Sequence, residues 1–391
     1  MADREPTRQD MANEATRRFE AGDHAAAQRL CRQILDDDPK QSQVLTLLGA
    51  SELATGRIGE AVAAFENAVE VDPDNAVARQ HLDTIARDRE AATESPYFKE
   101  YMALRPIYMD YPRRISIETV GRCNATCDFC PQGELDRRFT GMPDELFDKV
   151  IADLKDIPTD VPITIMPNLV NEPFMDRQML DRLQTINREL PQADLHIFTN
   201  FNVLPSDFFE RIPGIANLNT INVSFNAANQ EEYERVMGID FARTIDNLSR
   251  FMALNRERKV LSGPFILSRV ADLTERDDAF APQCRKLFPD FAAGEDYRTH
   301  VKNRTDWLGS IATEQSQIPY TLPCGAWFDI NVFCTGLVPH CCMDAKGDYA
   351  IGDVTRASLL EIYNSPRFRT YRETLTSRET AHPCNRCALL Q

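Results

Sequence analysis

Short apolar runs recur along residues 114–303, and longer amphipathic stretches separate them. The runs are rich in β-branched residues, as strands are, and span 114–120, 161–167, 193–200, 220–226, 265–270 and 297–303. The stretches between them repeat apolar positions at helical spacing over 143–157, 176–190, 205–212 and 242–258. Such alternation predicts a parallel sheet with right-handed crossovers. Because six units are too few for a closed eight-stranded barrel, we predict an α/β fold over residues 111–305. This fold is a partial (βα)6 barrel with its site at the carboxyl ends of the strands.

The N-terminal residues follow a different pattern, in which residues 20–39 resemble residues 53–73. Gly22, Ala27, Cys31 and Pro39 correspond to Gly56, Ala61, Phe65 and Pro73, each 34 residues further on. This period resembles the tetratricopeptide repeat, in which each unit is a helix–turn–helix. We therefore predict an all-α unit over residues 10–92, closed by a helix at Ala76–Arg87, with Cys31 as a core residue. Two repeats are few for independent stability, so we expect the unit to pack on the rest of the chain. Its surface fits either a groove for a peptide or protein partner or a solvated scaffold or dimerisation face.

Composition excludes some classes of partner. Lys and Arg number 44 against 60 Asp and Glu, a formal net charge of −16, which argues against nucleic-acid and anionic-membrane binding. The start of the chain, MADREPTRQD, lacks the apolar region of a signal peptide, and no apolar run approaches the roughly 20 residues that span a bilayer. We expect a cytoplasmic protein.

Eleven cysteines in such a protein favour metal or cluster binding over disulfides. Three of them, Cys123, Cys127 and Cys130, form the spacing C-x3-C-x2-C directly after the first predicted strand. Structural zinc normally takes four protein ligands, and no fourth cysteine is close in the sequence. A [4Fe–4S] cluster fully held by protein takes four thiolates, so three thiolates leave one iron open to another ligand.

The motif C-x3-C-x-aromatic-C, with Phe129 as the aromatic residue, resembles that of the radical S-adenosylmethionine (SAM) superfamily. The resemblance implies a [4Fe–4S] cluster on the three cysteines, with SAM bound at the open iron. It also implies reductive cleavage of SAM to methionine and a 5′-deoxyadenosyl radical, which abstracts a hydrogen atom from a substrate. An electron donor such as flavodoxin or ferredoxin would be needed.

A second signature follows the second predicted strand, where the family usually has Gly-Gly-Glu-Pro. This chain keeps Glu172 and Pro173 but has Asn171 where a glycine is usual. The resemblance implies that Glu172 accepts from the SAM ammonium and that Asn171 offers its backbone or amide. By the same resemblance, Ser224 would contact the SAM ribose or carboxylate, and Arg269 is a candidate for the carboxylate. A local hydroxyl–backbone contact for Ser224 and a structural ion pair for Arg269 are the alternatives.

The C-terminal region, residues 319–391, is rich in cysteine and loops, with one helix expected at 358–375. It resembles the SPASM/twitch extension of radical SAM enzymes and was expected to depend on a bound cluster more than on an apolar core. The resemblance implies one auxiliary [4Fe–4S] cluster on Cys324, Cys341, Cys384 and Cys387. Cys342 is an alternative to Cys341, and a zinc ion on the same thiolates is the alternative to the cluster.

A cluster with four thiolate ligands has no open iron, so electron transfer from a substrate radical is the role it favours. The net reaction would be a two-electron oxidation that also needs a base, for which Glu118, His340 and Asp344 are candidates. For His340 and Asp344 we expect solvent exposure rather than a catalytic role. The preferred substrate is a peptide or protein side chain, recruited by the repeats. Dehydrogenation of a sugar or aminocyclitol, and a zinc-containing scaffold without catalysis, are the alternatives.

Overall fold

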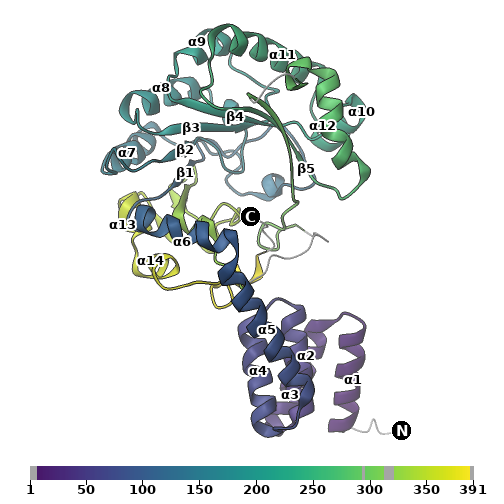
Figure 1. Cartoon of the computed structure of the whole chain (residues 1–391). Helices are drawn as coiled ribbons and strands as arrows, with labels where there is room; N and C mark the ends of the chain where they lie inside the picture. Colours follow the sequence, from purple (N-terminus) through teal and green to yellow (C-terminus); the bar gives the residue numbers. More distant parts are fainter. Residues whose placement is uncertain (1–6, 293–295, 312–320, 388–391) are drawn as a thin grey trace. The chain divides into compact units, whose positions relative to one another are not determined.

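The computed structural model describes residues 7–292, 296–311 and 321–387 (Figure 1). Residues 319–320 and 388–391 of the predicted C-terminal region lie outside the described part. The chain divides into two compact units. The first contains the N-terminal 103 residues together with residues 321–324 and 374–387, and the second contains most of the remainder.

The first unit is built on five helices. They are α1 (Arg8–Glu20), α2 (His24–Asp37), α3 (Ser42–Ala54), α4 (Ile58–Val71) and α5 (Ala76–Glu94). The predicted repeat is confirmed, and its closing helix α5 continues beyond Arg87. Cys31 is fully buried against Ala15 and Val44, as a core residue should be. Gly49 lets α3 approach α4, because a Cβ there would lie 2.6 Å from the Phe65 ring.

The C-terminal segment 374–387 packs with the repeats in this unit. Arg89 of α5 donates to both carboxylate oxygens of Glu379, at 2.7 to 3.1 Å. The hydroxyl of Tyr97 donates to the carbonyl of Pro323 at 3.2 Å. The short repeat array therefore contacts chain segments far away in sequence, as its small number of repeats predicted. Helix α6 (Pro96–Tyr108) then leads along the chain into the second unit.

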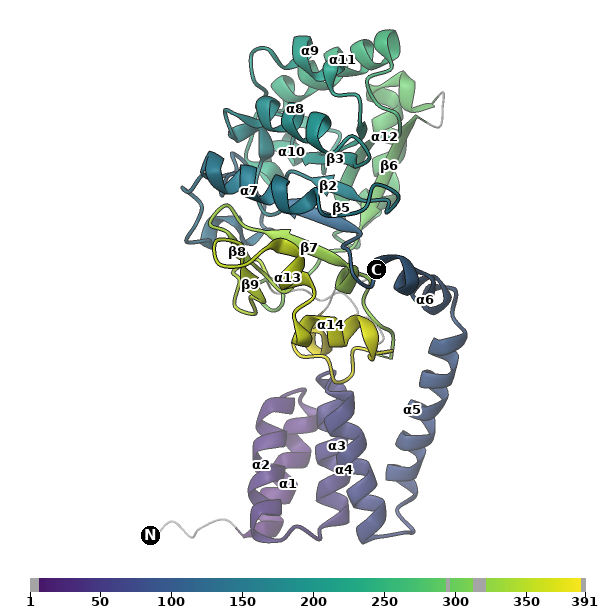
Figure 2. The same ribbon diagram turned by 90° about the vertical axis from the view of Figure 1, so that its left-hand side faces the viewer.

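The second unit contains a seven-stranded parallel sheet in the order β6-β5-β4-β3-β2-β1-β7. Strands β2, β3, β5, β6 and β7 of this sheet are labelled in Figure 2. Its strands are β1 (Arg114–Ile117), β2 (Thr164–Met166), β3 (Asp194–Thr199), β4 (Leu218–Ser224), β5 (Phe265–Val270), β6 (Tyr297–Lys302) and β7 (Asp329–Val332). Helices between these strands are α7 (Asp144–Leu154), α8 (Met179–Glu189), α9 (Phe208–Arg211), α10 (Gln230–Met237), α11 (Phe241–Arg258) and α12 (Glu275–Leu287). The predicted open barrel and its six strands are confirmed.

The seventh strand corrects the sequence interpretation. Strand β7 pairs in parallel with β1, Arg114 opposite Asp329, although its region was expected to be mostly loops. All four residues of β7 are buried, and Trp327, Phe328 and Phe333 beside it are almost completely inaccessible to water. Part of the C-terminal region therefore does have an apolar core. A four-residue strand between loops carries too little periodicity to be recognised from sequence.

The helix expected at 358–375 is two helices, α13 (Leu359–Tyr363) and α14 (Pro366–Glu373). Pro366 disfavours a helical conformation at Ser365, the residue before it, so the helix is interrupted between Tyr363 and Pro366. A small hairpin of β8 (Leu337–Val338) and β9 (Gly352–Asp353) precedes them. No helix in the described ranges combines the length and apolarity required to cross a membrane.

Candidate functional site

A cavity of about 350 Å³ lies at the carboxyl ends of the barrel strands. Residues that follow β1, β2, β3 and β4 line it, as the parallel sheet predicts. Among them are Cys123, Cys127, Cys130, Glu172, Asn200 and Ser224. The structure thus brings together both sequence motifs and the serine of β4.

The three cysteine side chains share one wall of this cavity, and burial makes their ionisation unfavourable. Burial raises the pKa of Cys123 to about 12, and the nearby Glu172 carboxylate adds to the effect. The pKa of Cys127 is raised by burial and then by Cys130 and Cys123. Burial also raises the pKa of Cys130. Three thiolates can therefore coexist here only when a cationic centre binds them.

Three soft sulfur donors around one cavity are the donor set that iron–sulfur clusters use. The residues present therefore fit a cluster with one iron not bound by protein. In the described part of the chain, no three His, Cys, Asp or Glu side chains are arranged closely enough to form a ligand set for a single metal ion. Two observations therefore support the fit of the three cysteines to a cluster, namely the chemistry of their sulfur atoms and the cavity that they share.

Glu172 is completely buried beside the thiols and is held by three donors. The Thr199 hydroxyl and the backbone N–H of Asn200 each donate to one of its two carboxylate oxygens at 2.6 Å. The backbone N–H of Phe174 donates at 3.2 Å. Burial raises the pKa of this carboxyl to about 7, although the hydrogen bonds favour its ionised form. A cationic group in the cavity would stabilise the carboxylate further.

The remaining predicted cofactor residues are divided between the cavity and its surroundings. Phe129, Asn171 and Ser224 line the cavity, whereas Pro173 is buried behind it at the start of a short 3₁₀ turn. The Phe129 carbonyl accepts from the indole N–H of Trp307 at 2.9 Å. Asn171 accepts from the Leu169 N–H at 2.8 Å, while its buried Nδ2 has no partner among the described residues. Asn171 thus offers an amide donor near the cavity.

Comparisons with known proteins identify similar domains and similar folds. A family model for the SPASM iron–sulfur cluster-binding domain matches residues 324–388, and a tetratricopeptide repeat model matches residues 18–82. No curated protein matches the chain in sequence. Among solved structures, SuiB of Streptococcus suis bound to precursor peptide SuiA is 13% identical with a TM-score of 0.53. That match covers 89% of this chain and 86% of SuiB.

SuiB bound to S-adenosylmethionine gives a TM-score of 0.50 at 13% identity, over 85% of this chain and 83% of SuiB. BtrN in complex with AdoMet and 2-DOIA is 16% identical, with a TM-score of 0.44 over 71% of this chain and 93% of BtrN. The chain therefore shares its fold with SuiB. The chain combines this barrel with segments that match the SPASM and tetratricopeptide repeat models.

The four cysteines predicted to hold an auxiliary cluster all lie within the SPASM match. Cys324, Cys384 and Cys387 are buried in the first compact unit, and Cys341 is buried in the second. Cys342 beside it is half-buried. Since the two units are described separately, the grouping of these thiols remains a prediction from sequence.

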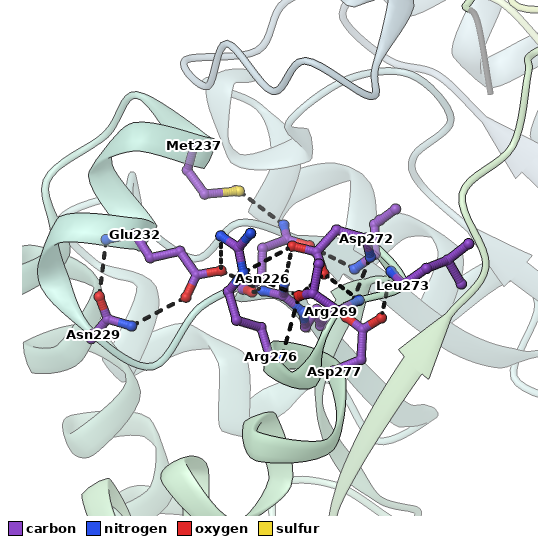
Figure 3. A network of polar contacts seen from close by, with 11 residues as sticks. Asn226, Asn229, Glu232, Met237, Arg269, Asp272, Leu273, Arg276 and Asp277 are labelled. Atoms are coloured by element: carbon purple, nitrogen blue, oxygen red, sulfur yellow. Dashed lines mark hydrogen bonds and ion pairs between the residues drawn. The ribbon is translucent and has the colours of Figure 1, made fainter. Parts of the chain in front are cut away.

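Arg269 does not line the cavity of the barrel. Its guanidinium donates to Glu232, Asp272 and Asp277 at 2.8 to 3.0 Å and to the carbonyl of Asn226 (Figure 3). The structure therefore supports the structural ion pair, the alternative assigned to this residue from sequence.

The three candidate bases also lie outside the set of cavity-lining residues. Glu118 is buried in an ion pair with Arg137, whose Nε lies 2.5 Å from Oε1. His340 and Asp344 are 1% and 3% exposed, so the expectation that solvent exposure explains them is wrong. The Asp344 carboxylate accepts from the backbone N–H groups of His340 and Tyr349, which fixes the local turn.

Several cavity residues were not identified from sequence. Asn200 lies after β3, Lys302 ends β6, and Met237 ends α10. Burial lowers the pKa of Lys302, whereas the nearby Cys130 and Cys127 thiols raise it. The positions of Asn200 and Lys302 at strand ends were the available signal, since that edge of a partial barrel carries the site. Met237 has no comparable signal.

The buried carboxyl of Glu172 predicts a specific pH dependence of stability. An unfolded chain ionises this group near 4.5 and the folded protein near 7, so folding favours the protonated form. The stabilising contribution of this group to the free energy of unfolding is fully present below pH 4.5. It is lost as pH rises to about 7, a change of about 3 kcal/mol. Urea unfolding of cluster-free wild-type and E172Q protein between pH 4.5 and 8 should show this difference. The same pH dependence of the free energy of unfolding in both proteins would contradict the raised pKa of Glu172.

Proposed function

We propose that this protein reductively cleaves S-adenosylmethionine and uses the resulting radical to oxidise a substrate by hydrogen abstraction. The observation that carries the proposal is the cavity shared by Cys123, Cys127, Cys130 and Glu172 in a barrel that shares its fold with SuiB. SuiB, which has the same fold, is bound to S-adenosylmethionine in one of its structures. A [4Fe–4S] cluster with one open iron supplies the electron and the coordination site for this cleavage.

The protein's own residues would orient S-adenosylmethionine through charge and hydrogen bonding. Glu172 would accept from the ammonium, because its carboxylate is held at the cavity by Thr199 and Asn200. The Ser224 hydroxyl would contact the ribose or carboxylate, and the unpartnered Asn171 amide would donate to an oxygen of the ligand. Glu172 is buried, which excludes water and strengthens its interaction with a bound cation.

The second part of the proposal concerns the SPASM domain. Cys324, Cys341, Cys384 and Cys387 would hold one auxiliary [4Fe–4S] cluster that accepts the electron left on the substrate. The match of the SPASM model to residues 324–388 supports this proposal. An electron donor such as flavodoxin or ferredoxin would supply the barrel cluster.

A peptide or protein side chain is the proposed substrate. SuiB, whose fold this chain shares over 89% of its length, is bound to a precursor peptide in its own structure. The tetratricopeptide repeats supply a further surface of the kind that binds protein segments. Since Arg89 of the repeats contacts Glu379 near Cys384, truncation of the repeats would also disturb the SPASM segment. Peptide binding is therefore tested on the full chain.

The cleavage proposal predicts the effect of removing one thiol. C127A should reduce formation of 5′-deoxyadenosine to background under strong reductant, because two thiolates cannot hold the cluster with its open iron. The matched control is C284A, which removes a buried cysteine of α12 outside the cavity. Chromatography of the anaerobic reaction measures the nucleoside. Deoxyadenosine formation by C127A at the C284A rate would refute the ligand assignment.

The auxiliary cluster predicts a change in iron content without loss of SAM cleavage. The wild-type chain should bind about eight irons after anaerobic reconstitution, and the C384A/C387A double variant about four, since each cluster holds four. Deoxyadenosine formation should persist in the double variant. C334A, which removes another buried cysteine of the same region, is the control. An unchanged iron content, or zinc without sulfide, would exclude the auxiliary cluster.

A further inference from the structure

The end of helix α10 contacts the cysteine loop of the barrel. The thioether sulfur of Met237 lies 3.4 Å from the Cys127 sulfur, and the Met237 carbonyl accepts from the Thr126 N–H at 2.9 Å. Gly238 then takes a left-handed φ of 67°, where a Cβ would lie 2.2 Å from the Thr126 hydroxyl. The middle cysteine of the motif is therefore held by both backbone and side chain of α10.

Asn226 fixes Met237 from the other side. Its Nδ2 donates to the Met237 sulfur at 2.9 Å, and its Oδ1 accepts from the Val270 N–H at 2.9 Å. The residue follows β4, is 2% exposed and has a φ of 59°. Asparagine adopts this left-handed conformation more readily than most other non-glycine residues, and the two side-chain hydrogen bonds hold it there. The amide thus links β5 to the thioether beside Cys127.

Arg269 holds both Asn226 and α10 in place (Figure 3). One of its terminal nitrogens donates to the Asn226 carbonyl and to Glu232 of α10, the latter at 3.0 Å. The other nitrogens donate to Asp272 and to Asp277 of α12, each at 2.8 Å. The Arg269 side chain is 4% exposed, so these charge-assisted bonds form with little competition from water. The network fixes the end of β4 and the helix that follows it.

We propose that Arg269, Asn226 and Met237 are positioning residues that act in series on Cys127. Arg269 fixes Asn226, Asn226 fixes the Met237 thioether, and the thioether packs against the Cys127 sulfur and excludes water from it. The inference rests on the proposed function, since it takes Cys127 as a cluster ligand. Groups that orient a ligand from behind typically change metal affinity by about 10- to 100-fold.

The test compares variants along this series by cluster retention and spectroscopy. After anaerobic reconstitution, N226A, M237A and R269M should lose the SAM-responsive cluster to a chelator about tenfold faster than wild type. The EPR signal of the reduced cluster that responds to added SAM should also change in these variants. M237L should restore most of the retention, because leucine fills nearly the same volume against Cys127.

Two controls separate positioning from general loss of stability. R235A alters an exposed residue of the same helix, and R182M removes a buried arginine of α8 that pairs with Asp144 and Asp176. Both should keep the wild-type rate of iron loss and the wild-type EPR signal. The proposal is overturned if N226A and M237A behave as wild type, or if R182M loses iron as fast as R269M. Failure of the proposed function is distinguishable, because the wild-type chain itself would then bind no SAM-responsive cluster.

Discussion

The free-energy cost of ionising three buried thiols is the constraint on which the site depends. Cys123, Cys127 and Cys130 line one cavity, and burial raises the pKa of each. Thiolates are stable there only with a bound cation, so the cavity is suited to a metal cluster and poorly suited to a reactive cysteine. Three thiolates also leave a coordination position open, and the buried Glu172 carboxyl beside them matches a ligand that carries an ammonium group.

The topology of the barrel brings the cysteines and the other cavity residues together. Parallel strands deliver the ends of β1, β2, β3 and β4 to one edge, so the cysteine loop, Glu172, Asn200 and Ser224 meet in the cavity. Two charged residues near this edge are paired outside the set of cavity-lining residues, since Arg269 is bound by three carboxylates and Glu118 by Arg137. The cavity wall itself is dominated by apolar and amide groups, which lets a bound ligand determine the local charge.

Local signals made the main features predictable, and long-range contacts account for what was missed. The six barrel strands and the repeat helices have clear periodicity, and the cysteine spacing lies within eight residues, so sequence alone identified them. Strand β7 becomes a strand only by pairing with β1, which lies more than two hundred residues earlier. The contact of Met237 with Cys127 and the burial of His340 likewise depend on folding. Arg269 shows the same limit, because a strand-end arginine is indistinguishable from a ligand-binding one until its three carboxylate partners are seen.

The central claim is that an iron of the barrel cluster binds S-adenosylmethionine directly. Electron–nuclear double resonance on the reduced, reconstituted protein with S-adenosylmethionine carrying ¹⁵N in its amino group and ¹⁷O in its carboxylate measures this contact. The account predicts hyperfine coupling of both nuclei to the cluster spin in the wild-type protein. Absence of both couplings in a protein that holds a reduced cluster and the labelled ligand would contradict it.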